Sequence, residues 1–110
     1  MKIGYMSIPG ATEREDKQFW IIRRVCSYYG IEEIILKSPT RKKEVVIPRQ
    51  VAMYCIKKYT HLGLKEVGTM FNRDHATVLH AINAIQNLMD TDKEYGARIK
   101  QFITNTFQQM

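Results

Sequence analysis

Residues 64–81 read LKEVGTMFNRDHATVLHA and carry the clearest structural signal of the chain. The first half has apolar or small residues on one helical face, namely Leu64, Val67, Gly68 and Phe71. Asn72 suits the left-handed position that ends a helix, and Asp74 can cap the next one by accepting from a backbone N–H near Thr77. Two short helices around a tight turn are predicted, which is the helix-turn-helix pattern.

The second of these helices, from about residue 75 to 89, is expected to have two unlike sides. The residues predicted to point inward are Val78, Leu79, Ile82, Ile85 and Met89. The residues predicted to form one exposed strip are Ala76, His80, Asn83 and Asn87. A helix with such a polar strip can lie in the major groove of DNA.

Helices are also expected on either side of this module. A capping box at Thr12 and Glu15 should start the first helix, and Gly30 should end it. Its expected buried stripe is Phe19, Ile22, Cys26 and Tyr29. A short helix is expected at residues 31–36, and the stretch Ser38-Pro39-Thr40 should break it.

Two longer helices complete the expected fold. Pro48 suits the first turn of one that runs to about Thr60. Its expected inner face is Val51, Cys55, Ile56 and Tyr59. A second capping box, at Thr91 and Glu94, should start the last helix, whose stripe is Tyr95, Ile99, Phe102, Ile103 and Phe107. The fold class is therefore all-α, with about six helices in residues 12–110 and an extended, partly mobile tail at residues 1–11.

Composition favours a polyanionic partner. The 110 residues include 17 Lys and Arg against 11 Asp and Glu, a net charge of +6. Nucleic acid and an acidic membrane surface both fit this excess. No apolar run reaches the ~20 residues of a membrane span, and the first residues lack the apolar core of a secretory signal, so a cytoplasmic, nucleoid-associated location is expected. Cys26 and Cys55 are expected to be reduced, buried thiols.

The start of the helix near residue 75 has side chains suited to reading bases. Asp74 can accept from cytosine, the methyl groups of Ala76 and Thr77 can pack on thymine, and His75 or Thr77 can reach a base edge or a phosphate. Taken singly, a capping aspartate, a helix-forming alanine and solvated histidines are the simpler interpretation. Together with the preceding helix and the basic loop, the group favours DNA readout.

The densest positive charge is the loop Arg41-Lys42-Lys43. Long cations on a loop can enter a narrow, A·T-rich minor groove, although most charge runs are only solvated. Arg49 and Gln50, just after Pro48, are expected to face a phosphate with their side chains and free backbone N–H groups. The full set of candidate phosphate contacts is Lys42, Lys43, Arg49, Gln50, Lys57, Lys65, Arg73 and His80.

Signals of catalysis are absent from the sequence. It has no Gly-rich phosphate loop and no HExxH pattern. His75 and His80 are five residues apart, a spacing that turns them away from each other on a helix. We therefore expect a non-enzyme with no metal, cofactor or small-molecule substrate, whose partner is double-stranded DNA.

Two stretches carry a family resemblance. Residues 72–81, NRDHATVLHA, and residues 48–54, PRQVAMY, together resemble the C-terminal duplex-binding domain of the bacterial chromosomal replication initiator, DnaA. The resemblance covers roughly residues 19–107. It implies binding to a short, asymmetric, A·T-rich duplex box, in replication origins or promoters. It also implies minor-groove insertion of Arg41, and base reading by Asp74, His75 and the next position. The backbone contacts that it implies are Arg49, Gln50, Lys57, Thr77 and His80.

The chain departs from the family pattern at three positions. Asn72 stands where the family has two glycines, which shortens the turn by one residue. Ala76 replaces a threonine and so keeps a methyl group without the hydroxyl. Lys65 stands where proline is frequent. The ATPase domain of the family's initiators is not in these residues, and we expect a stand-alone protein that occupies boxes, competes with a full-length initiator or regulates promoters.

Two other interpretations stay open. One is a helix-turn-helix transcriptional regulator with a different operator. The other is a protein-interaction module that docks on a full-length initiator or another replication protein.

Overall fold

The computed structural model describes residues 13–108, and within that range it has six helices and no strand. The helices are α1 (Glu13–Tyr29), α2 (Glu33–Leu36), α3 (Lys43–Tyr59), α4 (Leu64–Met70), α5 (His75–Thr91) and α6 (Lys93–Phe107). The expected all-α, helix-turn-helix class is confirmed. The tail expected at residues 1–11 and the cap expected at Thr12 lie outside the described residues.

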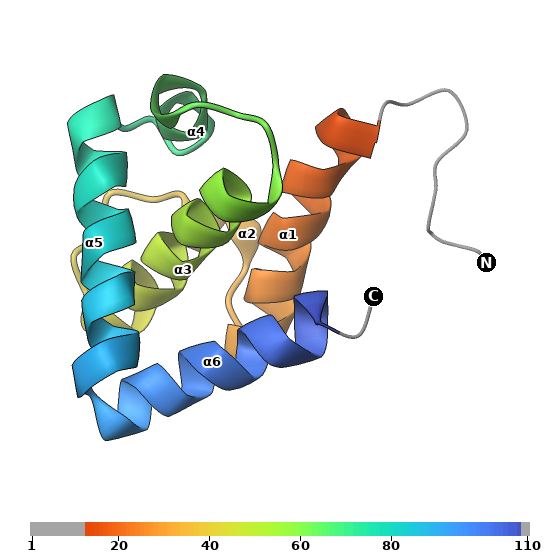
Figure 1. The fold of residues 1–110 in the computed structure, drawn as a ribbon. Coiled ribbons are helices and arrows are strands. Elements are labelled where there is room, and N and C mark those ends of the chain that lie inside the picture. The colour runs from red at the N-terminus through yellow and green to blue at the C-terminus, as the bar shows by residue number, and fades with distance from the viewer. Residues whose placement is uncertain (1–12, 109–110) are drawn as a thin grey trace.

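Helix α3 lies at the centre of the fold, and four of the other helices pack against it (Figure 1). Residues 51–56 are all buried, because α1, α2, α4 and α5 pack directly against this helix. Helix α6 packs against α5 and closes the lower side of the molecule in Figure 1. Within the described range, no helix is long and apolar enough to cross a membrane.

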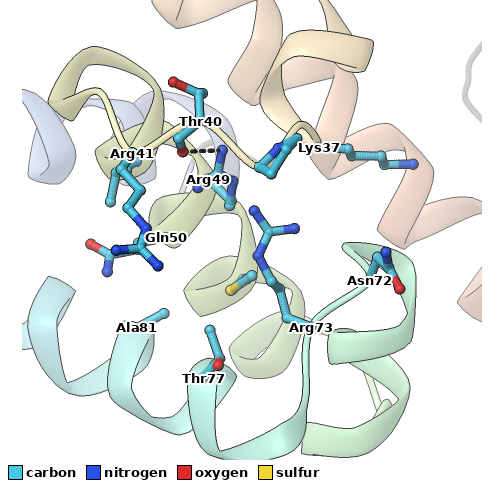
Figure 2. A pocket seen from close by; sticks show the side chains of 12 residues that line it. Lys37, Thr40, Arg41, Arg49, Gln50, Asn72, Arg73, Thr77 and Ala81 are labelled. Atoms are coloured by element: carbon cyan, nitrogen blue, oxygen red, sulfur yellow. Dashed lines mark hydrogen bonds between the residues drawn. The ribbon is translucent and has the colours of Figure 1, made fainter.

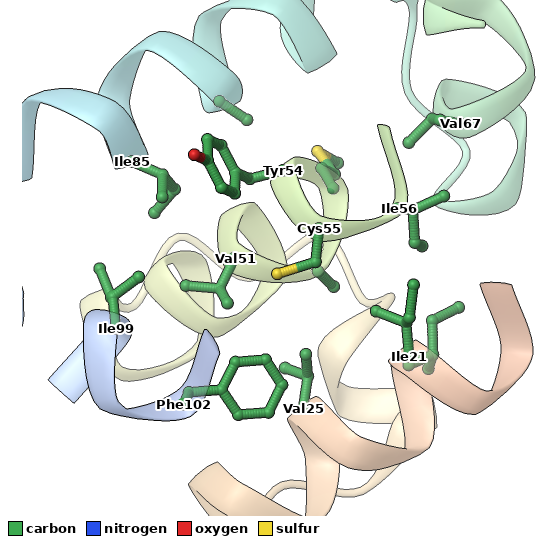
Figure 3. Close-up of a cluster of buried hydrophobic side chains, with 14 of the residues drawn as sticks. Ile21, Val25, Val51, Tyr54, Cys55, Ile56, Val67, Ile85, Ile99 and Phe102 are labelled. Carbon is green, nitrogen blue, oxygen red and sulfur yellow. The ribbon is translucent and has the colours of Figure 1, made fainter. Parts of the chain in front are cut away.

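The core joins helices that are far apart in the sequence (Figure 3). Val25 of α1 and Phe102 of α6 approach Cys55 of α3, while Ile85 of α5 lies on another side of the same helix. All four are at most 1% exposed. Because burying such a side chain contributes about 1.5–3 kcal/mol, this shared core fixes the helices relative to one another.

Helix α1 buries a different stripe from the one expected. Phe19 is 52% exposed, so its assignment to the core was wrong. Ile22 is fully buried as expected, and Ile21 and Val25 are fully buried as well. Of the other expected residues, Cys26 and Tyr29 are half-buried and pack against the core. Gly30 has a φ of 67° and ends the helix as expected.

The two cysteines are free, but they differ in burial. Cys55 is fully buried, and burial raises the pKa of its thiol to about 12. Cys26 is only half-buried, so the expected burial holds for one thiol and not fully for the other.

The start of α3 corrects the prediction made from Pro48. The helix begins at Lys43, so Pro48 lies in its second turn. A proline there lacks the N–H that would pair with the Glu44 carbonyl, but Glu44 is exposed, where water can pair with it. Burial of Val45 and Ile47 offsets this cost. Arg49 is therefore well inside the helix, and the free backbone N–H groups expected there do not exist.

The residue that caps α6, at the corner between α5 and α6, is not the one predicted from the sequence. Asp92, not Thr91, caps α6, because its carboxylate accepts from the backbone N–H groups of Glu94 and Tyr95 at 3.0 and 2.7 Å. The Thr91 hydroxyl instead donates to the Asn87 carbonyl at 2.7 Å within α5. The short helix α2 likewise begins at Glu33 rather than at residue 31, with Glu32 before it.

Candidate nucleic-acid interface

The turn between α4 and α5 has the hydrogen bonds of a Schellman motif. The Asn72 N–H donates to the Thr69 carbonyl at 3.2 Å, and the Arg73 N–H donates to the Gly68 carbonyl at 2.8 Å. Asn72 has a φ of 56°, in the left-handed region that asparagine tolerates. The shortened turn is thus made by one left-handed residue, as the sequence predicts.

Gly68 lets the turn close tightly against α4. A Cβ atom on this residue would overlap the Arg73 carbonyl oxygen. Any side chain here would push α5 away from α4, so the angle between the two helices depends on this glycine.

The first turn of α5 is exposed and capped. The Asp74 carboxylate accepts from the Thr77 backbone N–H at 2.8 Å, as predicted. This hydrogen bond lowers the pKa of Asp74, and the neighbouring His75 lowers it further. His75, Ala76 and Thr77 are also exposed. The four residues expected to read bases in the major groove therefore lie together at the start of α5.

The faces of α5 follow the prediction with one exception. Val78, Ala81 and Ile85 are buried, whereas Leu79 is 48% exposed and does not point inward as expected. The predicted exposed strip is Ala76, His80, Asn83 and Asn87, and all four are exposed. Leu79 is one position from Val78, so it turns from the buried side toward the solvent.

Contrary to the prediction from the sequence, Arg49 does not face outward toward a phosphate. It is only 6% exposed, and its guanidinium donates to three backbone carbonyls of the α2–α3 loop. These are the carbonyls of Leu36 at 2.8 Å, Ser38 at 2.7 Å and Thr40 at 3.1 Å. Helix α3 begins before Pro48, which turns Arg49 toward the loop instead of outward.

Arg73 approaches the same loop from the other side. Its guanidinium donates to the Ser38 carbonyl at 2.9 Å and to the Phe71 carbonyl within its own turn. Burial lowers the pKa of Arg49, and the nearby charge of Arg73 lowers it further. Arginine stays protonated in proteins, so two positive groups lie side by side here.

These residues line a hollow between the α2–α3 loop, α3 and α5 (Figure 2). Its volume is about 490 Å³. The charged side chains in its lining are all basic, namely Lys37, Arg41, Arg49 and Arg73. Gln50 and Thr77 also line it. The hollow therefore lies between a predicted phosphate contact, Gln50, and a predicted base contact, Thr77.

Within the described residues, ion pairs neutralise little of the positive charge of this surface. Among the side chains that the structure describes, the one ion pair joins Lys37 to Glu33 at 2.9 Å. Arg41 and Lys42 are exposed next to the hollow. An uncompensated cluster of cations favours an anionic ligand.

The other predicted phosphate contacts are more scattered. Lys43 lies in the first turn of α3, with its ammonium 4.5 Å from the centre of the Tyr95 ring, so it packs toward α6 instead of belonging to a loop. Lys57 is half-buried, whereas Lys65 and His80 are exposed on α4 and α5. None of these four lines the hollow.

Comparison with known proteins assigns the chain to a family. The family model for the bacterial dnaA protein helix-turn-helix matches residues 20–85, from α1 to most of α5. This chain belongs to that family. It is a family of DNA-binding helix-turn-helix domains.

Several chromosomal replication initiator proteins DnaA are similar to the chain. A protein from Thermus thermophilus is 45% identical over 83 residues, which is 74% of this chain and 19% of that protein. The Wolbachia protein (subspecies Brugia malayi) is 40% identical over 82 residues, 74% of this chain and 18% of that protein. The Deinococcus radiodurans protein is 38% identical over 79 residues, 72% and 17% respectively. The chain thus spans less than a fifth of the length of these relatives.

The stretch from Lys37 to Thr40 was not predicted from the sequence as a part of the hollow. Lys37 lines it, and Ser38 and Thr40 give their carbonyls to the buried arginine, yet the sequence marked this stretch only as a helix breaker. The one sequence feature that could have indicated their role is that Ser38-Pro39-Thr40 directly precede the basic run Arg41-Lys42-Lys43.

Proposed function

We propose that this chain binds duplex DNA in a sequence-specific manner, reading the major groove with the start of α5 and the minor groove with the loop that carries Arg41. The observation that supports this most is the exposed, capped tip of α5, which adjoins a hollow lined by cations. The family membership supports the same class of ligand.

The major-groove part of the proposal rests on the exposure of α5. A groove about 12 Å wide admits a helix, and the first turn of α5 is exposed at an end of the helix that the other described helices leave uncovered (Figure 1). Asp74 and His75 offer an acceptor and an imidazole to base edges, while Ala76 and Thr77 offer methyl groups to thymine. Ala76 lacks a hydroxyl, so we propose an apolar contact there and no hydrogen bond.

The minor-groove part rests on Arg41. Its side chain is exposed and follows Thr40, whose carbonyl is bound to the buried Arg49. The loop is therefore held while the cation stays free to enter a narrow, negative groove. Lys42 lies beside it and is proposed to contact a phosphate of the same groove.

The remaining residues predicted to contact the DNA phosphates fall into direct and indirect groups, according to where their side chains lie. We propose Gln50, Lys57, Lys65 and His80 as direct phosphate contacts, since each has an accessible side chain. We propose that Arg49 acts indirectly, by shaping the loop. Lys43 is proposed to reach a phosphate only if it leaves the ring of Tyr95.

The biological role that fits is the occupation of DnaA-box-like, A·T-rich sites in replication origins or promoters, in the initiation or regulation of DNA replication. The relatives named above are replication initiators, and this chain matches less than a fifth of their length. A nucleoid-associated location follows from this role.

Selection from a random duplex pool, followed by titration of the selected duplex at several salt concentrations, tests the proposal. The logarithm of the association constant should fall against the logarithm of salt with a slope of about −0.9 for each phosphate neutralised. Arg41→Ala should weaken binding most on duplexes with an A·T-rich segment, and Arg23→Ala, an exposed arginine of α1, is the matched control. Failure of the pool to yield a duplex sequence would refute the proposal.

A protein contact is the second candidate function, because α2 exposes two adjacent apolar residues. Ile34 is 75% and Ile35 is 43% exposed. A full-length initiator or another replication protein is the proposed partner of this surface. Ile34→Glu should then abolish co-purification with a purified initiator while leaving duplex binding unchanged, and unchanged co-purification would refute it.

A further inference from the structure

The Ser38 carbonyl is a junction between two parts of the proposed interface. It accepts from Arg49 of α3 at 2.7 Å and from Arg73 of the α4–α5 turn at 2.9 Å. A carbonyl oxygen has two lone pairs, so both donors can be accommodated. Figure 2 shows the Arg73 side chain extending from the turn toward Arg49 and the loop.

The two arginines have different tasks at this junction. Arg49 binds the carbonyls of Leu36, Ser38 and Thr40, and so fixes the loop to α3. Arg73 binds the Phe71 and Ser38 carbonyls, and so joins the turn that starts α5 to the same loop. These two carbonyls lie 33 positions apart in the sequence, yet one side chain links them.

We infer that Arg73 is a positioning residue, which sets the place of the Arg41 loop relative to the start of α5. This inference rests on the proposed function, in which Arg41 and Asp74 read opposite grooves of one duplex. Arg41 is three residues after Ser38, and Asp74 directly follows Arg73. Arg73 thus joins the turn before Asp74 directly to the loop before Arg41, in addition to the bonds by which Arg49 fixes that loop to α3, and this direct link sets which groove spacing the protein accepts.

The chemistry of the side chain accounts for arginine at this position. A guanidinium is a planar fork whose separate nitrogens can donate to two carbonyls at once, whereas a lysine ammonium is a point donor on a flexible stem. Lysine at position 73 would keep the charge but lose the fork. This difference separates a positioning role from a simple phosphate contact, which lysine would preserve.

The first experiment needs no DNA. Backbone ¹⁵N relaxation would be measured for the unaltered chain, Arg73→Gln, Arg73→Lys and the control Arg23→Gln. We expect the order parameters of Thr40 and Arg41 to fall from about 0.85 to below about 0.6 in both Arg73 variants, with α3 unchanged. Unchanged values at these two residues would overturn the inference, whether or not the chain binds DNA.

The second experiment measures the consequence on the selected duplex. Arg73→Lys should bind it about tenfold more weakly with an unchanged salt slope, and Arg73→Gln should lose at least as much. Inserting one base pair between the A·T-rich segment and the major-groove segment should cost the unaltered chain more than Arg73→Lys. Full binding by Arg73→Lys would show a phosphate contact instead and overturn the positioning role.

The two experiments also separate failure of the inference from failure of the proposed function. If the unaltered chain selects no duplex, the proposed function fails, and the relaxation measurement still decides whether Arg73 fixes the loop.

Discussion

Helices α3 and α5 are both 17 residues long, but their surroundings are opposite. Ten residues of α3 are buried, including the unbroken run 51–56, whereas only Val78, Ala81 and Ile85 are buried in α5. A helix that is mostly buried supports the fold, and a helix attached along one strip leaves its other faces free for a ligand. The difference separates residues that hold the interface in place from residues that form it.

The largest expected loss of stability comes from a substitution in the core face of α3. Ile56→Ala in α3 should lower the free energy of unfolding by about 2–5 kcal/mol, because a fully buried side chain leaves a cavity. Leu79→Ala in α5 should cost less than about 1 kcal/mol, since Leu79 is 48% exposed. Urea unfolding of both variants measures the contrast. Equal losses would show that the two helices do not differ in this way.

Arg49 should give the next largest effect. Arg49→Met keeps much of the buried volume but leaves the Leu36, Ser38 and Thr40 carbonyls without their donor. We expect the free energy of unfolding to fall by about 1.5–3 kcal/mol. The exposed Arg23 is the matched control, and Arg23→Met should change it by less than about 0.5 kcal/mol. A loss no greater than in this control would contradict the buried role of Arg49.

The smallest expected effect on stability concerns the cap of α5 and depends on pH. The Thr77 N–H lowers the pKa of Asp74 below its ordinary value of 3.8, so the charged carboxylate stabilises the folded state. That contribution is complete above the ordinary value and is lost as the pH falls through the lowered one. Asp74→Asn keeps a capping oxygen without a titrating group. Its stability relative to the unaltered chain should therefore rise in acid, and a constant difference from pH 6 downward would contradict the cap.

The helix-turn-helix could be predicted from the sequence because α4 and α5 each bury one narrow strip. Asn72, Asp74 and the exposed strip from Ala76 to Asn87 were all placed correctly, since capping and turn residues act on their nearest neighbours. Leu79 was the exception, because it lies at the edge of the strip. Its position depends on how far α5 is rotated against α3 and α4.

For α3, the predicted end near Thr60 and the burial of Val51, Cys55 and Ile56 are confirmed, but the predicted start was wrong for a physical reason. A helix buried on all sides shows no clear period of 3.6 residues, so its start was read from Pro48 alone. The actual start at Lys43 turns Arg49 into the loop. The hydrogen bonds from Arg49 and Arg73 to Ser38 join residues 11 and 35 positions apart, and no local pattern indicates such contacts.

Duplex binding by His75→Ala tests the central claim most directly, because His75 is exposed at the tip of α5 and supports nothing in the core. We predict a loss of about 1–3 kcal/mol on the selected duplex, a much smaller loss on a scrambled duplex of the same length, and a free energy of unfolding within about 0.5 kcal/mol of the unaltered chain. Equal losses on the two duplexes would contradict base reading by α5.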